Sequence, residues 1–136
     1  MRDQIFSFED LKVWGKSVDF AEMVIQAIDC FETPRKHYRL IEQLEAAATS
    51  PAMNIAEGKG RFSKKEFIHY LYIARGSLFE TITLLIIVQR MGWVPDDTFH
   101  QIKSLGEEIT KMINSLIKSV RHSDNFSSGA YELMNS

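Results

Sequence analysis

The sequence predicts an all-α protein, an antiparallel up-down-up-down four-helix bundle. Four segments place apolar residues at alternating steps of three and four, which is the period of a helix face and not of a strand. Short turn segments separate them. A chain of 136 residues with 45% hydrophobic content is long enough for one domain with a core. We expect the bundle in residues 1–122 and a loosely ordered tail, without periodicity, in residues 123–136.

The first two helices are predicted over residues 8–30 and 35–57. The apolar seam of the first consists of Leu11, Trp14, Val18, Ala21, Ile25 and Ile28. The seam of the second consists of Ile41, Leu44, Ala48, Pro51 and Ile55. Because Pro51 lacks a backbone donor and its ring crowds the carbonyl of Ala47, we expect a kink in the second helix there.

The third helix is predicted over residues 63–91. Ser63 followed three residues later by Glu66 forms a capping box at its start, and Gly92 is suited to close its end. Its seam consists of Phe67, Leu71, Ala74, Leu78, Thr81, Leu85 and Val88. Gly76 within this helix costs about 1 kcal/mol relative to Ala, so we expect a close helix crossing to require it.

The fourth helix is predicted over residues 95–121, because Pro95 and two following acidic residues favour a helix start. Its seam consists of Ile102, Leu105, Ile109, Met112 and Leu116. Between the second and third helices, Gly58 and Gly60 are expected to adopt the positive φ that closes a helix C-terminus.

The net charge of −2 gives the whole protein no general attraction for polyanions. The charge is uneven, however: residues 1–32 carry −4 and residues 33–65 carry +4. Polyanion binding would therefore have to come from a local basic patch.

A cytoplasmic location without a membrane partner is expected. Cys30 is the one cysteine and cannot form an internal disulfide; we interpret it as a small apolar residue filling space at a helix end. The N-terminus has no long apolar run typical of a signal peptide. The longest apolar run, residues 82–88, is too short to span a bilayer.

The first and third helices carry more apolar residues than a four-helix monomer can enclose, since residues 82–88 are apolar nearly all round the helix. We therefore expect a homo-oligomer. Its interface is predicted to include Phe20, Val24, Phe79, Ile82 and Ile86.

No catalytic residue, metal site or cofactor is predicted, and we expect the protein not to be an enzyme. Glu66 and His69 have the Glu-x-x-His spacing of di-metal bundles. At 100° per residue, however, both point away from the seam that contains Phe67, and His100 likewise points outward. The Gly-Lys-Gly-Arg sequence that starts at Gly58 lacks the preceding strand and the Gly-Lys-Ser/Thr ending of a phosphate-binding loop.

The second-to-third helix turn is strongly basic, with four Lys or Arg residues within seven positions. The predicted nucleic-acid-binding residues are Lys59, Arg61, Lys64, Lys65, Arg35, Lys36 and Arg39. A cluster of such cations is what binding to phosphates requires. The alternative is that this charge only solvates one end of a structural or protein-binding oligomer with no affinity for RNA or DNA.

Several motifs resemble a known family: Asn54-Ile55-Ala56-Glu57-Gly58, Arg61, Glu66-Phe67, Ala74-x-Gly76-Ser77-x-x-Glu80, and upstream Phe8-Glu9-Asp10-Leu11-x-Val13-Trp14. Over about residues 6–120 the chain resembles the bacterial four-helix-bundle proteins encoded in intervening sequences of large-subunit rRNA genes. It is also similar to the accessory protein of diversity-generating retroelements. The resemblance implies a homopentamer without known catalysis. The partners it implies are RNA, DNA or a nucleic-acid enzyme such as a reverse transcriptase.

The polar residues of the motif are Asn54, Glu57, Ser77 and Glu80. They are expected either to support the fold, through turn hydrogen bonds, an Arg61–Glu57 pair and a contact of Glu80 with Arg39, or to form a surface for a ligand or partner. The chain departs from the family at Glu45 and Ala46, where two basic residues are common. This difference makes the second helix less favourable for a polyanion.

Overall fold

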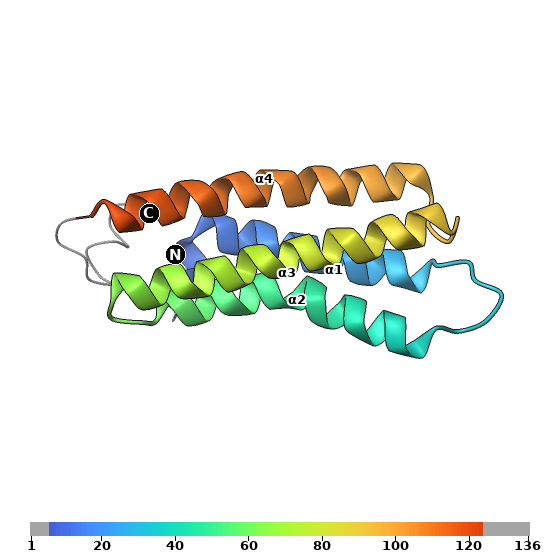
Figure 1. Cartoon of the computed structure of the whole chain (residues 1–136), viewed down its shortest axis with the longest axis horizontal. Helices are drawn as coiled ribbons and strands as arrows, with labels where there is room; N and C mark the ends of the chain where they lie inside the picture. Colours follow the sequence, from blue (N-terminus) through green and yellow to red (C-terminus); the bar gives the residue numbers. More distant parts are fainter. Residues whose placement is uncertain (1–5, 124–136) are drawn as a thin grey trace, which may run out of the picture.

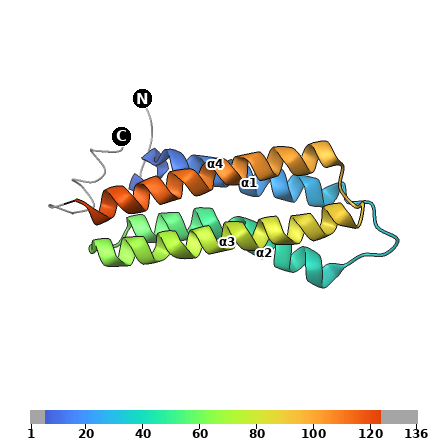
Figure 2. The same ribbon diagram turned by 45° about the horizontal axis from the view of Figure 1, so that its top comes forward.

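The computed structural model describes residues 6–123, which form one bundle of four helices (Figure 1). The elements are the 3-10 helix η1 (Ser7–Asp10), α1 (Lys12–Asp29), α2 (Tyr38–Lys59), α3 (Lys64–Arg90) and α4 (Asp96–Arg121). Each helix packs against two others, α1 and α3 both contacting α2 and α4. Figure 2 shows α1 and α4 together above α2 and α3. The predicted all-α four-helix fold is confirmed. Of the predicted tail, residues 124–136 lie outside the described residues.

The first loop is longer than predicted, because α2 begins at Tyr38 and not at residue 35. The hydroxyl of Thr33 donates a hydrogen bond to the carbonyl of Arg35 and so favours a turn over a helix there. The backbone N–H of Glu32 donates to the carbonyl oxygen of Trp93 at 3.1 Å. The ring of His37 also stacks on Trp93, with ring centroids 4.4 Å apart. These contacts tie the first loop to the α3–α4 loop.

The seam of α3 is buried as predicted at all seven positions. In α1 the predicted phase was wrong by about one residue, although Leu11 and Ala21 of the predicted seam are buried. The buried residues of α1 are Val13, Ser17, Phe20, Ala21, Val24 and Ala27. Ser17 is tolerated in the core because its hydroxyl donates to the carbonyl oxygen of Val13 at 2.7 Å. Both faces of α1 carry apolar residues, so periodicity alone did not identify the inner one.

Because the buried face of α1 differs from the predicted one, the predicted oligomer interface must also be corrected. Phe20 and Val24 are fully buried within the single chain, so they do not belong to an outer surface. Cys30, by contrast, is exposed at the end of α1 and does not fill space in the core.

The close helix contacts occur at Gly58 and Gly106, and not at Gly76 as predicted. A Cβ atom at Gly58 would lie 2.7 Å from the Cβ of Tyr70, and one at Gly106 would lie 3.2 Å from Cδ1 of Ile82. At Gly76 nothing lies within 4 Å of the added atom. Of the described residues, only Gly92 has a positive φ, 77°, at the end of α3.

One of the two helix termini at the α2–α3 turn follows its predicted chemistry and the other does not. Ser63 accepts a hydrogen bond from the backbone N–H of Glu66 at 3.1 Å, as a capping residue does. Gly60 ends α2 with a right-handed φ of −79°, so the positive φ expected there is wrong. Pro51 lies inside α2, and Figure 1 shows the two halves of this helix running in different directions, as the predicted kink requires.

By length and composition, α3 meets the requirement for a membrane-spanning helix, with a mean hydropathy of 1.7. The expectation from residues 82–88 alone missed this, because it considered one short apolar run, interrupted by Thr83, and not the whole helix. In the bundle, 39% of the qualifying window is buried, and a core helix meets the same requirement. Its composition therefore reflects one face packed in the core and a second face with apolar residues of its own.

We predict opposite effects for alanine at two glycines. Gly58→Ala should lower the free energy of unfolding by about 1–3 kcal/mol, because the new methyl group meets Tyr70. Gly76→Ala, with open space around it, should raise it by up to about 1 kcal/mol. Urea denaturation at one protein concentration measures both. Equal destabilisation by the two substitutions would contradict this account.

Candidate functional site

The predicted basic residues do not form one patch. The α2–α3 turn lies at the end of the bundle that also holds η1 and the C-terminus of α4. Arg35, Lys36 and Arg39 belong to the α1–α2 loop and the first turn of α2, at the opposite end (Figure 1). The α2 helix of 22 residues separates the two groups by about 33 Å. A single site made of all seven cations is therefore excluded within one chain.

Lys59 corrects the prediction in a second way, because its side chain is only 2% exposed. It lies in the last turn of α2, packed within the bundle, and does not present its amine at the surface. We therefore remove Lys59 from the candidate phosphate-binding residues.

Arg61 contacts groups within its own chain. Its Nη2 donates to Oε1 of Glu57 at 2.5 Å and to the hydroxyl of Tyr70 at 2.8 Å, and its guanidinium lies 5.0 Å from the centre of the Tyr70 ring. The hydrogen bond with Glu57 raises the pKa of Arg61 above its ordinary value. The predicted Arg61–Glu57 pair is confirmed. A hollow of about 490 Å³ beside the turn is lined by Glu57 and Glu66 as well as Arg61, so its charge is mixed.

Lys64 closes the end of α4. Its Nζ donates to the carbonyl oxygens of Arg121 at 3.1 Å and Ser123 at 2.7 Å. The Arg121 carbonyl is among those that a helix C-terminus leaves without partners, and Ser123 directly follows the C-cap His122; a cation there also complements the helix dipole. Lys65, the next residue, is exposed and makes no such contact within residues 6–123.

The polar motif residues are brought together only in part. Asn54 Nδ2 donates to the Oγ of Ser50 at 2.8 Å, and this oxygen lies 2.7 Å from the Oγ of Ser77. The three side chains join α2 to α3 near the kink. Ser50 was not predicted as a member, because its role depends on the register between the two helices.

Glu80 does not join this group. It is exposed on α3, and the part of the chain that the structure describes shows no ion pair between Glu80 and Arg39. That predicted contact is wrong. The network of Asn54, Ser50 and Ser77 is half-buried between two helices, which favours its structural interpretation.

A second group of polar residues was missed by sequence reasoning. The Arg75 guanidinium lies 4.8 Å from the centre of the Tyr72 ring, and its Nη1 donates to Oδ1 of Asn114 at 2.8 Å. Arg121 Nη2 donates to the Tyr72 hydroxyl at 2.8 Å. The spacing of Tyr72 and Arg75 on one helix was visible in the sequence, but their partners on α4 depend on how the helices align.

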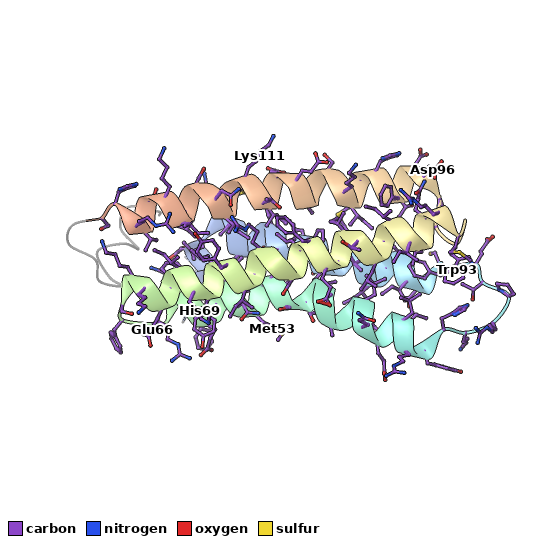
Figure 3. All side chains as sticks on the ribbon, in the orientation of Figure 1. Met53, Glu66, His69, Trp93, Asp96 and Lys111 are labelled. Carbon is purple, nitrogen blue, oxygen red and sulfur yellow. The ribbon has the colours of Figure 1, made fainter. Side chains whose placement is uncertain are left out.

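The histidines lie where the helical phase predicted. His69 and His100 are exposed, and Figure 3 shows Glu66 and His69 at the surface of α3. Within residues 6–123, no group of three His, Cys, Asp or Glu side chains is placed to hold a metal ion.

Of the remaining predicted interface residues, only Phe79 lies on the outside of α3, where it is 52% exposed. Ile82 and Ile86 are half-buried and pack against the hydrophobic core, and Ile82 lies next to Gly106 of α4. Further exposed apolar side chains are Ile73 and Ile87 on the same helix and Met91 at its C-cap. We call Phe79, Ile87 and Met91 the outer apolar face of α3.

These features define an all-α bundle in which Asn54 and Ser77 of the polar motif, together with Ser50, connect α2 to α3, and whose third helix keeps an apolar outer face. Residues 9–115 match the family described as 23S rRNA-intervening sequence protein, and the chain belongs to that family. A solved structure of a protein of unknown function from the S23 ribosomal protein family of Bacteroides thetaiotaomicron is similar, with 27% sequence identity and a TM-score of 0.72. The alignment covers 78% of this chain and 98% of that one. No curated protein matches the chain.

We predict that Lys64 contributes to stability and Lys65 does not. Lys64→Met should lower the free energy of unfolding by about 1 kcal/mol, because two carbonyls at the end of α4 lose their donor. Lys65→Met, the matched control, should change it by less than about 0.5 kcal/mol. Thermal unfolding followed by circular dichroism separates the two. A larger effect at Lys65 would refute the capping role of Lys64.

Proposed function

We propose that this protein is a non-enzymatic interaction module that assembles with further copies of itself through the outer apolar face of α3. The observation that carries the proposal is the exposure of its apolar side chains: Phe79 is 52%, Ile87 47% and Met91 58% exposed. Because these residues recur at spacings of eight and four, they lie along one side of the helix. Such a row exposed to water favours burial against another surface.

A second copy is the partner that the chain itself best supports. The α3 helix already packs one face in its own bundle. On its outer face the exposed apolar residues are accompanied by exposed Glu80, Thr83 and Arg90, as in an interface whose apolar core has a polar rim. The family resemblance of the motif residues implies a ring of five copies. Neighbouring Ile82 and Ile86 are half-buried against the core, and their exposed parts would extend the contact.

We predict that Phe79→Lys combined with Ile87→Lys converts the assembly into monomers, because two ammonium groups would have to be buried without partners. Light scattering at micromolar concentration measures the mass. Phe62→Lys is the matched control, since Phe62 is 88% exposed but lies in the α2–α3 turn. It should leave the mass unchanged. An unchanged mass in the double variant would overturn the proposed interface.

Binding of RNA or DNA, or of a nucleic-acid enzyme such as a reverse transcriptase, is the second candidate function. The observation that favours it is the gathering of cations from three elements at one end of the bundle. They are Arg61, Lys64, Lys65 and Arg121. Arg61 and Lys64 already donate hydrogen bonds to groups in their own chain. The turn alone therefore supports nucleic-acid binding less strongly than the sequence suggested.

For this second candidate we predict that labelled structured RNA or duplex DNA binds and that the binding weakens steeply with salt, because phosphate contacts release counterions. Lys64→Ala with Lys65→Ala should weaken the binding. Lys36→Ala with Arg39→Ala removes the same charge at the opposite end and should leave it nearly unchanged. Fluorescence anisotropy at several salt concentrations gives the affinities. Absence of binding at about 50 mM salt would discard nucleic-acid binding and leave a protein-only assembly.

A further inference from the structure

Tyr72 lies between two arginines that come from different helices. Arg75, one turn later on α3, places its guanidinium 4.8 Å from the centre of the Tyr72 ring. Arg121, from the last turn of α4, donates to the Tyr72 hydroxyl at 2.8 Å. We call Tyr72, Arg75, Asn114 and Arg121 the arginine–tyrosine cluster.

The positive charge of this cluster is not neutralised by the partners that hold it. The guanidinium of Arg75 contacts an aromatic ring and the amide oxygen of Asn114, and that of Arg121 contacts a phenol hydroxyl. All three partners are neutral. Two ion pairs elsewhere among residues 6–123 are Arg61 with Glu57 and Lys16 with Glu108. Both cluster arginines therefore keep a full charge for an external anion.

The same contacts also fix where the two guanidinium groups lie. A cation–π contact and a hydrogen bond together restrict the Arg75 side chain, which reduces the conformational entropy lost when it binds a ligand. A planar guanidinium presents several N–H donors in a fork that fits phosphate oxygens. Among the described residues, each of these two arginines donates one side-chain hydrogen bond, so further N–H donors remain. The cluster is thus charged and pre-organised.

The position of the cluster suits an extended polyanion better than a small one. It lies across the surfaces of two adjacent helices, with Tyr72 41% exposed and Arg121 exposed. Lys118, one turn before Arg121, adds another exposed cation on α4. From Asn114 to Arg121 the helix advances about 10 Å, the axial length of about three phosphates of one strand.

We propose that Tyr72, Arg75, Lys118 and Arg121 bind the phosphate backbone of RNA or DNA. This inference rests on the second candidate function and moves its principal contact from the α2–α3 turn to the surface of α3 and α4. The reason is that the two groups of cations have different partners within the chain. In the turn, Lys59 is buried, Arg61 is paired with Glu57 and Lys64 caps α4, whereas the cluster arginines face neutral groups. The apolar outer face of α3 lies further along the helix, so both surfaces can act in one assembly.

In the test, labelled duplex DNA and structured RNA are titrated with the unsubstituted protein and with the double variant Arg75→Gln, Arg121→Gln. Fluorescence anisotropy reports the binding. Glutamine keeps a donor for Asn114 and Tyr72 while removing the charge. Affinity should fall at least about tenfold, and the slope of log affinity against log salt should fall by about two. Lys36→Gln with Arg39→Gln, the matched control at the other end, should change the affinity by less than about twofold.

Tyr72→Phe tests the positioning role of the hydroxyl. It keeps the ring next to Arg75 but removes the hydrogen-bond acceptor of Arg121, so the affinity should fall a few-fold without a change in the salt slope. A loss as large as that of the double arginine variant would overturn the assignment of the charge to Arg75 and Arg121. Circular dichroism shows whether each variant is folded.

Three other outcomes separate this inference from the function on which it rests. If the unsubstituted protein binds neither nucleic acid, the second candidate function fails and the inference fails with it. If the Lys64 and Lys65 variant loses binding while the arginine variant retains it, the candidate function stands and the inference is overturned. If the arginine variant instead changes the mass measured by light scattering, the cluster contacts a second copy, which also overturns it.

Discussion

The rest of the structure depends on the close packing of α2 against α3 at Gly58. With no side chain on Gly58, the backbone of α2 reaches the Cβ of Tyr70, and the two helices join through a turn of four residues. Arg61 can then contact the Tyr70 ring and hydroxyl across the turn. The same geometry starts α3 beside the end of α4, where Lys64 reaches the last carbonyls. The basic turn is therefore in large part a structural device.

The α3 helix contributes residues to three surfaces of the protein. It carries more apolar residues than its inner face alone can hold. Its inner face supplies the seam that begins at Phe67 and ends at Val88. On the outside, its N-terminal half carries Tyr72 and Arg75, which contact α4, and its C-terminal half carries the outer apolar face. We infer that a charged surface and a self-assembly surface lie one after the other on the same helix. With this division, a chain with a net charge of −2 would still present a local basic surface to a polyanion.

The sequence predicted the fold well because each helix has a strong period and clear end signals such as Ser63 and Gly92. It did not predict which face of α1 is buried, because two faces of this helix carry apolar residues. Ser17 also lies on the buried face, where its polar hydroxyl is satisfied by a hydrogen bond that the sequence does not reveal. The division of the cations between the two ends follows from the antiparallel topology and was within reach of sequence reasoning. The contact of Arg75 with Asn114, in contrast, depends on the register of α3 against α4, which no local pattern encodes.

The most direct test of the account is the mass of the unsubstituted protein by native mass spectrometry at micromolar concentration. The account predicts a discrete multiple of the 15.7 kDa chain, and five copies if the family resemblance extends to the assembly. The apolar outer face of α3 would then be buried between copies. A single species of 15.7 kDa that persists as the concentration rises would contradict the central claim, because that face would then remain exposed to water.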